Sequence, residues 1–597
     1  MYQSFTVKDI AKHVPSRLKI LRKYLASIKL DGFIVPRSDV HQGEYVIERD
    51  ERLSWLTGFT GSAGTAIILS QKAGLFVDGR YRAQVKSEVN QNDFEIVPFP
   101  HTTLSRWIKI NTSPNSQIGF DPWLMSNIQI SKIKKKLKGT DIKLTPLRRN
   151  PIDHIWHDQP KAKKTKAKIH PIEFAGESHQ KKRERLALKL REIDAKAAVI
   201  TLPDSIAWLL NIRGNDIPRN PVMQCFAILF DDAKIKLYVQ KEKVSDITDH
   251  LGIDISILPP SSFIKTLKLF DEPILLDRDS VPYAVASACS QPIIKRDPCI
   301  LPKARKNAVE ISGAINAHTR DAVAMIEFLA WLDAHKHNIL TEIDIVKKLE
   351  KERRKDPMLQ DISFDTIAGT GANGAIVHYR VSTKTNSIIE NGHLLVLDSG
   401  GQYIDGTTDV TRTIAIGDVT EEKRTSYTQV LKCMIAVSRL RWPKNLSGHD
   451  IESIGRFHLW QAHRDFDHGL GHGVGSYLNV HEGPQRLSRT SDIPLEPGMI
   501  LSNEPGYYRE GKYGIRIENL LVVEAALAPS DGDKHREMLC WRTLTLVPLE
   551  RKLIQKDKLT SNEIKWLNEY HLEVNKKINN LVSLTAQQWL NKATAPI

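Results

Sequence analysis

The sequence has few cysteines and no long hydrophobic run. Its 597 residues include only 5 cysteines, which are odd in number, widely scattered and without a CxxC pair. This usage indicates reduced thiols and argues against both a disulfide framework and a cysteine zinc site. No apolar run reaches the roughly 18 residues that suggest a membrane span, and Met1 to Leu21 lacks the apolar core of a signal peptide. We therefore expect a soluble, cytoplasmic protein without a membrane partner.

What the chain does have is charge, and that charge is unevenly distributed. The composition is 26% charged and 41% hydrophobic, which at this length allows several domains with substantial cores. The net charge is +15, and residues 132–168 alone hold 13 lysines and arginines against 3 aspartates. This segment could touch nucleic acid or an acidic surface, but its two lysine clusters contain no aromatic residue and no nucleic-acid motif accompanies them. We favour a solvated helix face followed by a flexible linker at 161–170, and we expect no nucleic-acid partner.

Composition shifts divide the chain into four parts. The lysine-rich linker places the first break after residue 161. The second falls after residue 302, ahead of a stretch from Ile311 to Leu329 with apolar residues at helical spacing. The predicted domains are 1–161, 162–302 and 303–545, followed by a C-terminal extension at 546–597.

The first two parts share a weak internal likeness. Each has a short apolar strand, GFIV or AAVI, followed by a segment with a tryptophan, ERLSWLTGF or DSIAWLLNI. This likeness predicts a duplicated α/β module in which Trp55 and Trp208 belong to the core. In the extension, TSNE at 560–563 has the form of a capping box and predicts a terminal helix with a structural role.

Five candidate metal ligands lie in one part of the third domain. They are Asp398 in LLVLDSGG, Asp409 in GTTDVTRT, His472 in HGLGHGVG, Glu504 in SNEPGYY and Glu518 in GIRIEN. Four carboxylates and one imidazole suit two hard divalent cations, because carboxylate oxygens can bridge two ions and offset their charge. Each residue alone is more often a turn, cap or hydrogen-bonded structural residue. The full set in this order favours a dinuclear hydrolase.

The local patterns allow two of these carboxylates to face each other. Residues 393–398 predict one strand, and residues 407–416, rich in β-branched side chains, predict the returning strand of a hairpin. Alternate residues of a strand share a face. Asp398 and Asp409 could therefore meet across the hairpin.

Two further segments add neighbours to this predicted site. Residues 514–522 predict a strand on which Arg516 shares a face with Glu518, which makes Arg516 a candidate partner for a ligand carboxylate. His468 and His472 lie among glycines, whose missing Cβ atoms let the backbone approach a ligand closely.

These motifs resemble a known family. GTGANGAIVHY, LDSGGQYIDGTTDVTRT, HGLGHGVGSYLNVHEGP, NEPGYY and GIRIEN resemble the catalytic domain of Xaa-Pro aminopeptidase, or aminopeptidase P, of peptidase family M24 and the pita-bread (creatinase) superfamily. RSDVHQGEYVIERDERLSWLTGFTGSAGTAII and DSIAWLLNIRGNDIPRNPV resemble the two noncatalytic domains of its long, three-domain form. The resemblance covers nearly the whole chain. It implies an α/β (α+β) fold with two creatinase-N-like modules, a pita-bread catalytic domain and a helical C-terminal extension.

The resemblance also implies a role for each ligand. Asp409 and Glu518 would bridge two metal ions, Asp398 would complete the ligands of one ion, and His472 and Glu504 would complete those of the other. A bridging water would attack the scissile carbonyl as hydroxide, and Glu504 would take its proton and pass one to the leaving prolyl nitrogen. The family is typically manganese-dependent. The oxygen-rich ligand set agrees with Mn²⁺, although cobalt, iron or zinc could also bind it.

Further residues match substrate-binding positions. His378 in VHY and His481 in NVHEGP match positions that contact the substrate and stabilise the tetrahedral intermediate, which fits a need for donors aimed at developing negative charge. His468 matches a histidine of the substrate pocket, and a packing role for it stays open. Arg516 and Arg213 are further candidates for substrate binding. Arg213, in NIRG, would have to reach the active site across a domain interface.

The implied reaction is the release of an N-terminal residue from peptides whose second residue is proline, by a protein that forms a homodimer. Prolidase, which cuts only dipeptides, is the main alternative, and the three-domain length argues against both it and methionine aminopeptidase. Creatinase-like members lack the ligands that this chain has. Noncatalytic pita-bread proteins that bind ribosomes, RNA or histones usually lack them too, so a binding role stays a secondary alternative.

Overall fold

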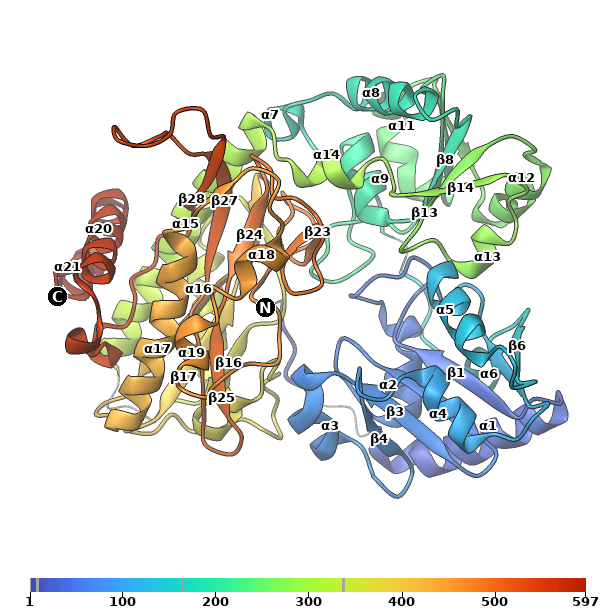
Figure 1. The fold of residues 1–597 in the computed structure, drawn as a ribbon, viewed down its shortest axis with the longest axis horizontal. Helices are drawn as coiled ribbons and strands as arrows, with labels where there is room; N and C mark the ends of the chain where they lie inside the picture. Colours follow the sequence, from blue (N-terminus) through green and yellow to red (C-terminus); the bar gives the residue numbers. More distant parts are fainter. Residues whose placement is uncertain (1, 7–9, 164, 336–338) are drawn as a thin grey trace. The chain divides into compact units, whose positions relative to one another are not determined.

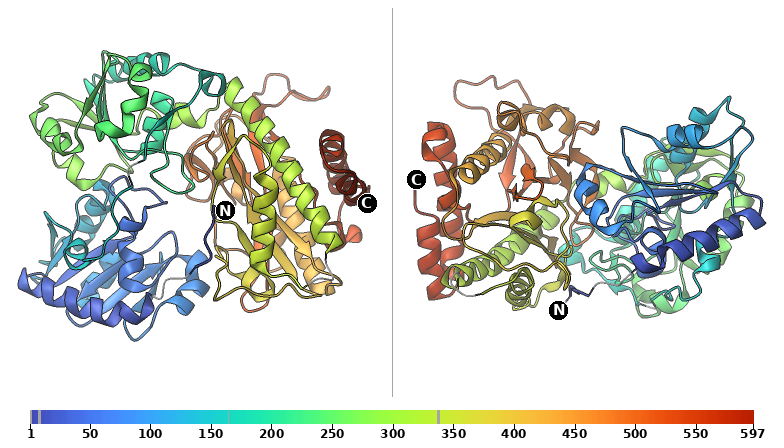
Figure 2. Two further views of the ribbon diagram at one scale, coloured as in Figure 1. Left: turned by 180° about the vertical axis from the view of Figure 1, so that it is seen from behind. Right: turned by 90° about the horizontal axis from the view of Figure 1, so that it is seen from below.

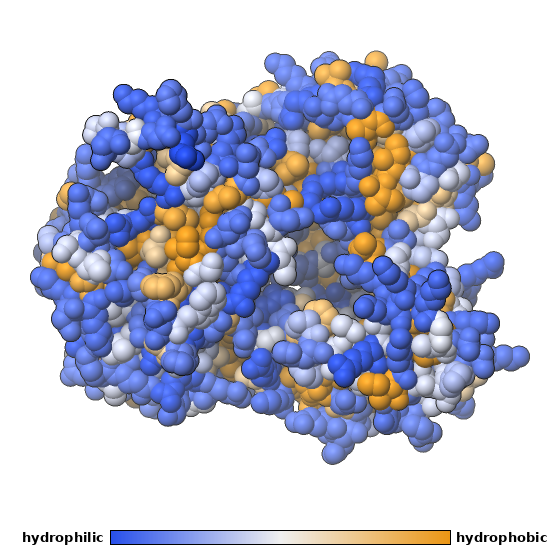
Figure 3. Space-filling view, in the orientation of Figure 1, coloured by the Kyte–Doolittle hydropathy of each residue, from blue (hydrophilic) through white to orange (hydrophobic). Residues whose placement is uncertain are grey.

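The computed structural model describes residues 2–6, 10–163, 165–335 and 339–597. The chain forms two compact units (Figure 1). The noncatalytic unit comprises Lys8–Ile172 and Glu177–Ile300, and the ligand-bearing unit comprises Met1–Val7, Glu173–Gly176 and Leu301–Ile597. The face drawn in Figure 3 is mostly hydrophilic, with apolar residues in separate patches. Among the described residues, no helix is both long and apolar enough to cross a membrane.

The noncatalytic unit holds two six-stranded sheets. The first has the order β4-β3-β2-β1-β5-β6, with strands β1 (Gly32–Pro36), β2 (Thr65–Leu69), β3 (Ala73–Val77), β4 (Glu95–Pro98), β5 (Gln117–Phe120) and β6 (Lys143–Pro146). The second has the order β12-β11-β10-β8-β13-β14, with strands β8 (Ala197–Ile200), β10 (Phe226–Phe230), β11 (Ile235–Tyr238), β12 (Ile255–Leu258), β13 (Ile274–Asp277) and β14 (Pro292–Lys295).

The two sheets repeat one pairing pattern. β1 pairs antiparallel with β2 and parallel with β5, and β8 pairs in the same way with β10 and β13. Every residue of β1 and β8 is buried, as central strands covered on both faces require. Trp55 in α2 (Arg52–Thr57) and Trp208 in α9 (Pro203–Leu210) are also buried. The duplicated α/β module predicted from the sequence is therefore confirmed.

The structure confirms one of the two predictions made for the basic segment at 132–168 and its linker, and contradicts the other in part. Lys132, Lys135 and Lys136 are exposed on α5 (Asn127–Leu137), so the prediction of a solvated helix face is confirmed. The prediction of a flexible linker is wrong for residues 165–170. There, β7 (Lys168–Ile169) pairs with β9 (Ile212–Arg213), because the second module offers backbone partners that composition does not reveal.

The described residues of the ligand-bearing unit form four sheets. Their orders are β15-β18-β19, β16-β17-β20, β21-β28-β27-β24-β22-β23 and β25-β26. Their strands are β15 (Leu359–Ile362), β16 (Ile367–Thr370), β17 (Leu394–Ser399), β18 (Gly401–Tyr403), β19 (Gly406–Thr407), β20 (Val410–Ala415), β21 (Arg441–Pro443), β22 (Gly471–Gly473), β23 (Glu482–Leu487), β24 (Ile500–Asn503), β25 (Gly506–Arg509), β26 (Tyr513–Arg516), β27 (Asn519–Ala525) and β28 (Met538–Thr543).

Helices pack against these sheets and form one large core with them (Figure 2). Its long helices are α15 (Ala308–Ala334), α16 (Glu342–Arg353), α17 (Glu421–Ser438), α20 (Ser561–Ile578) and α21 (Leu584–Ala593). α15 confirms the helix expected from the apolar spacing between Ile311 and Leu329. At the start of α20, Thr560 and Glu563 form the predicted capping box.

The antiparallel pairing predicted for the two strands around residues 393–398 and 407–416 is confirmed. The simple hairpin is wrong, because β18 and β19 lie between them in the chain and belong to another sheet, and Asp409 lies just before β20. β17 and β20 pair antiparallel, with Asp398 opposite Thr411. The single strand predicted at 514–522 is wrong, because the chain changes sheets within it. β26 pairs with β25, whereas β27 pairs with β24 and β28, and Glu518 lies at the break between them.

Gly514 in β26 allows a close approach between two backbone segments. A Cβ at this position would lie 1.7 Å from the carbonyl oxygen of Gly374, in the short helix η6 (Gly371–Ala375). The carbonyl oxygen belongs to the backbone and a Cβ is bonded directly to it, so no side-chain rotation can relieve the clash.

We expect Gly514→Ala to destabilise the fold by about 1–3 kcal/mol, the usual cost of overpacking. Gly469→Ala is the control, since its added Cβ would meet its nearest neighbour, the carbonyl oxygen of Leu487, at an ordinary 3.6 Å. Denaturant unfolding of both variants measures the effect. Equal midpoints for the two variants would contradict the close approach.

Candidate metal centre

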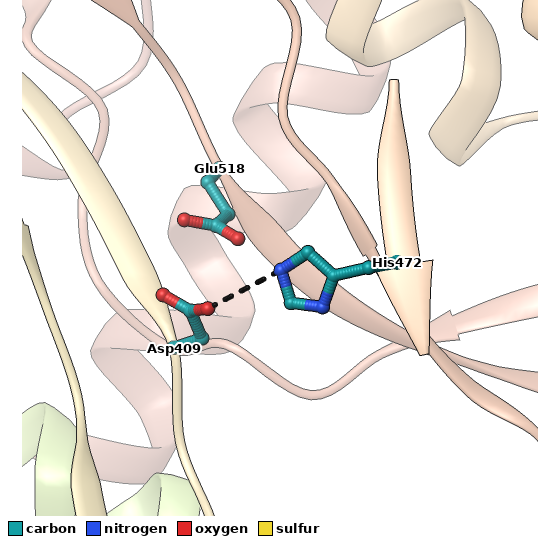
Figure 4. Close-up of side chains that lie close together, drawn as sticks. All are labelled: Asp409, His472 and Glu518. Carbon is teal, nitrogen blue, oxygen red and sulfur yellow. Dashed lines mark ion pairs between the residues drawn. The ribbon is translucent and has the colours of Figure 1, made fainter. Parts of the chain in front are cut away.

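Three ligand candidates from separate strands meet at one point. Potential ligand atoms of Asp409, His472 and Glu518 all lie within 4.8 Å of one another (Figure 4). Asp409 immediately precedes β20, His472 is the middle residue of β22, and Glu518 lies between β26 and β27. Residues 109 positions apart along the chain, from 409 to 518, are thus brought together by the sheet that contains β20 and the six-stranded sheet that contains β22 and β27.

The other two candidates adjoin this group. The imidazole Nε2 of His472 lies 3.4 Å from Glu504 Oε1 and 3.6 Å from Asp409 Oδ2. Asp398 lies opposite Thr411 in the sheet, and the Thr411 hydroxyl contacts Glu518. The structure therefore brings all five sequence candidates into one cluster.

Burial and mutual repulsion make this cluster unfavourable when it is fully ionised. Burial, followed by the charges of neighbouring carboxylates, raises the pKa of both Asp409 and Glu518 well above its ordinary value. The pKa of Glu504 rises to about 7, mainly through burial and with a further contribution from Asp398, while Arg516 and His481 oppose the shift. Divalent cations would remove this penalty, because they compensate the negative charge directly.

Several oxygens of the cluster are left without hydrogen bonds. Asp398 Oδ1, Asp409 Oδ1 and Glu518 Oε1 are buried and have no hydrogen-bond partner in the described parts of the chain. Buried polar atoms nearly always have a partner, so three such oxygens in one cluster require an explanation. Hard divalent cations bind carboxylate oxygens, and the donor set therefore fits them.

Hydrogen bonds fix the orientation of His472. Its Nδ1 lies 2.9 Å from the carbonyl oxygen of Gly473, and a carbonyl can only accept. Nδ1 therefore carries a proton, and Nε2 faces the carboxylates. Metal-binding histidines commonly have this arrangement.

A second layer of hydrogen bonds orients the carboxylates. The Thr411 hydroxyl donates to Glu518 Oε2 at 2.8 Å, and the Ser502 hydroxyl donates to Glu504 Oε1 at 3.1 Å. Arg516 donates to Asp398 Oδ2 at 2.6 Å. Each of these bonds leaves the second oxygen of its carboxylate available to a cation.

Two of the candidate substrate-binding residues lie beside these carboxylates and their hydrogen-bond donors. The rings of His481 and His472 meet edge to face, with centroids 4.4 Å apart. The loop that carries His378 is tied to the site through its neighbour Val377, whose carbonyl oxygen accepts from Arg516 at 3.2 Å. Their roles in substrate binding remain predictions.

Tyr508 connects two of the candidates and was missed by the sequence analysis. Its hydroxyl accepts from Arg516 at 2.8 Å and donates to His468 Nε2 at 3.0 Å. The tautomer follows from His468 Nδ1, which lies 2.8 Å from the carbonyl oxygen of Gly469. The position of Tyr508 in β25, two residues after NEPG, is the signal that could have identified it.

Arg213 belongs to the noncatalytic unit. It is 5% exposed, and its Nη1 donates to the carbonyl oxygens of Ile212 at 2.9 Å and Ala207 at 3.3 Å. These contacts hold the side chain within its own module. Its reach to the active site remains a prediction.

Family models match the chain from residue 17 to its end. Two models described as creatinase/prolidase N-terminal domains match residues 17–152 and 158–310. The model of metallopeptidase family M24 matches residues 313–525, and the C-terminal region of peptidase M24 matches residues 537–597. The domain boundaries predicted above remain predictions at the level of single residues.

Full-length relatives have the same organisation. A probable Xaa-Pro aminopeptidase P from Neosartorya fischeri is 37% identical over 97% of this chain and 92% of its own length. One from Coccidioides posadasii is 36% identical over 100% of this chain and 95% of its own. The crystal structure of an X-prolyl aminopeptidase from Caenorhabditis elegans, described as a cytosolic enzyme with a di-nuclear active site, is 31% identical with a TM-score of 0.93, covering 98% of this chain and 100% of that one. The chain therefore belongs to the Xaa-Pro aminopeptidase P group of metallopeptidase family M24.

Proposed function

We propose that this protein is a dinuclear-metal aminopeptidase that hydrolyses the bond between an N-terminal residue and a following proline. The observation that carries the proposal is the cluster of four carboxylates and His472, in which three buried carboxylate oxygens lack hydrogen-bond partners among the described residues. The proline specificity is supported by the full-length similarity to relatives that carry that name.

The chemistry of the substrate bond fits such a site. An Xaa-Pro bond is a tertiary amide, and its nitrogen has no hydrogen to donate. Asp398, Asp409, His472, Glu504 and Glu518 would hold the metal ions. When bound, a pair of divalent cations supplies Lewis-acid stabilisation of developing negative charge and a nucleophile at neutral pH.

Residues in and around the cluster would transfer protons and stabilise the negative charge that develops on the substrate. Glu504 would accept the proton of the attacking water and return one to the prolyl nitrogen. The Ser502 hydroxyl orients the Glu504 carboxylate for this transfer. His481 and His378 would donate to the oxyanion of the tetrahedral intermediate.

The finer properties are also proposals. Manganese is favoured because the ligand set is rich in oxygen. A cytosolic location is supported by the description of the Caenorhabditis elegans enzyme. We propose a homodimer from the family resemblance, and sedimentation equilibrium of the purified protein tests it by measuring the mass of the particle.

We expect the protein to hydrolyse Arg-Pro-Pro but neither Arg-Ala-Ala nor the dipeptide Ala-Pro, and to require added Mn²⁺ after metal removal. Glu504→Gln should lower kcat by roughly 10²–10⁴-fold, the usual contribution of a positioned acid–base group. Glu524→Gln, on the exposed end of β27, is the matched control and should retain activity. Exclusive cleavage of Ala-Pro would identify a prolidase, and the absence of cleavage with any metal would favour a binding protein.

The raised pKa values predict how the stability of the metal-free protein depends on pH. The pKa of Glu504 rises from 4.5 to about 7 on folding, so between these values the folded state holds a proton that the unfolded state has lost. The stability must then fall as the pH rises through this window, by about 1.4 kcal/mol per pH unit for each such proton. The raised pKa values of Asp409 and Glu518 act in the same direction.

Thermal unfolding of chelated protein between pH 5 and pH 8 measures this slope. Added Mn²⁺ should restore the stability at the upper end, because the metal binds the deprotonated carboxylates. Glu504→Gln should flatten part of the slope, since its amide cannot ionise. A thermal midpoint of the metal-free protein that rises between pH 6 and pH 8 would contradict the prediction.

A further inference from the structure

Arg412, in β20, has a buried guanidinium whose hydrogen bonds go to the backbone and to neutral side chains. It is 2% exposed and follows Thr411, so its side chain lies on the opposite face of β20 from the carboxylate cluster. Its nitrogens donate to six acceptors, none of which is a carboxylate. They are the carbonyl oxygens of Thr411 (2.8 Å), Glu518 (2.6 Å), Val547 (2.7 Å) and Pro548 (2.9 Å), Asn519 Oδ1 (2.8 Å) and the Tyr570 hydroxyl (3.0 Å).

One end of this guanidinium joins the segments that carry two metal-ligand candidates. Nη1 of Arg412 donates to the carbonyl oxygens of Thr411 and Glu518. The amide of Glu518 donates to the same Thr411 carbonyl at 3.1 Å, and the Thr411 hydroxyl holds the Glu518 carboxylate. Asp409 lies two residues before Thr411. Arg412 therefore fixes the backbone of Glu518 relative to the strand that Asp409 precedes.

The other end is held by the C-terminal region. Nη2 and Nε donate to Val547, Pro548 and the hydroxyl of Tyr570 in α20. The Tyr570 hydroxyl in turn donates to the Val547 carbonyl oxygen at 2.7 Å. α20 packs against α15 and α17, so this hydroxyl is attached to the core of the unit and not to a mobile tail (Figure 2).

The geometry points to a function for the C-terminal region, residues 546–597. We propose that it is a supporting part of the metal centre, in which Tyr570 and the carbonyls of residues 547 and 548 hold Arg412, and Arg412 in turn sets the position of Glu518. Arg412 and Tyr570 are positioning residues, because neither touches substrate or metal. The inference rests on the proposed metal site, and it goes beyond the structural role expected for the terminal helix.

Tyr570→Phe tests the proposal with a minimal change. It removes the hydroxyl but keeps the ring, which stacks on Trp566 with centroids 5.3 Å apart. We expect amide hydrogen exchange at residues 517–522 of the metal-free protein to become at least fivefold faster. The dissociation constant for Mn²⁺, measured by competition with a chelator, should rise about 10-fold, the lower end for removing a partner of a metal ligand. kcat should fall while KM stays unchanged.

Leu567→Ala is the matched control. Leu567 lies one turn before Tyr570 in α20 and is fully buried, so its truncation leaves a cavity and lowers the stability without touching Arg412. We expect normal exchange at residues 517–522 and normal Mn²⁺ affinity in this variant. Arg412→Lys, which keeps the charge but not the planar set of donors, should reproduce and exceed the effects of Tyr570→Phe.

The outcomes separate this inference from the proposed function. Equal losses of Mn²⁺ affinity in Tyr570→Phe and Leu567→Ala would reduce the C-terminal region to a structural role and overturn the inference. Unchanged exchange and affinity in Tyr570→Phe would overturn it as well. If the wild-type protein bound no Mn²⁺, the metal site itself would fail, and the exchange measurement on the metal-free protein would still decide whether Tyr570 holds Glu518.

Discussion

The repulsion among four clustered carboxylates, three of them buried, is the constraint on which the rest of this structure depends. Arg516 neutralises Asp398 directly, yet Asp398, Asp409 and Glu518 each keep a buried oxygen without a hydrogen-bond partner among the described residues. Carboxylates in such a position either take up protons or bind cations. The raised pKa values mean that the metal-free cluster takes up protons. The proposed metal ions would take their place.

The scaffold keeps these charges together by spreading their attachment over several elements. Arg516 in β26 donates a hydrogen bond to Asp398, and Thr411 in β20 donates one to Glu518. Ser502 in β24 donates one to Glu504. Each attachment is a hydrogen bond from a buried side chain that restricts the carboxylate, and of the three donors Arg516 also neutralises the charge of its partner, Asp398. Rigid strands can hold such a set more accurately than loops can, and this accuracy favours selective binding of metal ions over a loose association.

The sequence predicted those features that depend on local pattern. The local pattern predicted the antiparallel pair of strands around Asp398 and Asp409, the capping box marked the start of α20, and the repeated apolar segments indicated a duplicated module. It failed where distant contacts decide the structure. The linker at 165–170 is ordered by strand β9, the chain changes sheets at Glu518, and the six acceptors of Arg412 come from segments up to 158 positions away. No local pattern encodes such partners.

The most direct test of the central claim is anomalous X-ray scattering from crystals grown with Mn²⁺, recorded at the manganese absorption edge. Two bound ions are expected in the cluster, with the carboxylates of Asp409 and Glu518 contacting both. His472 and Glu504 should contact one ion, and Asp398 should contact the other. A single ion, or manganese bound outside this cluster, would contradict the dinuclear centre.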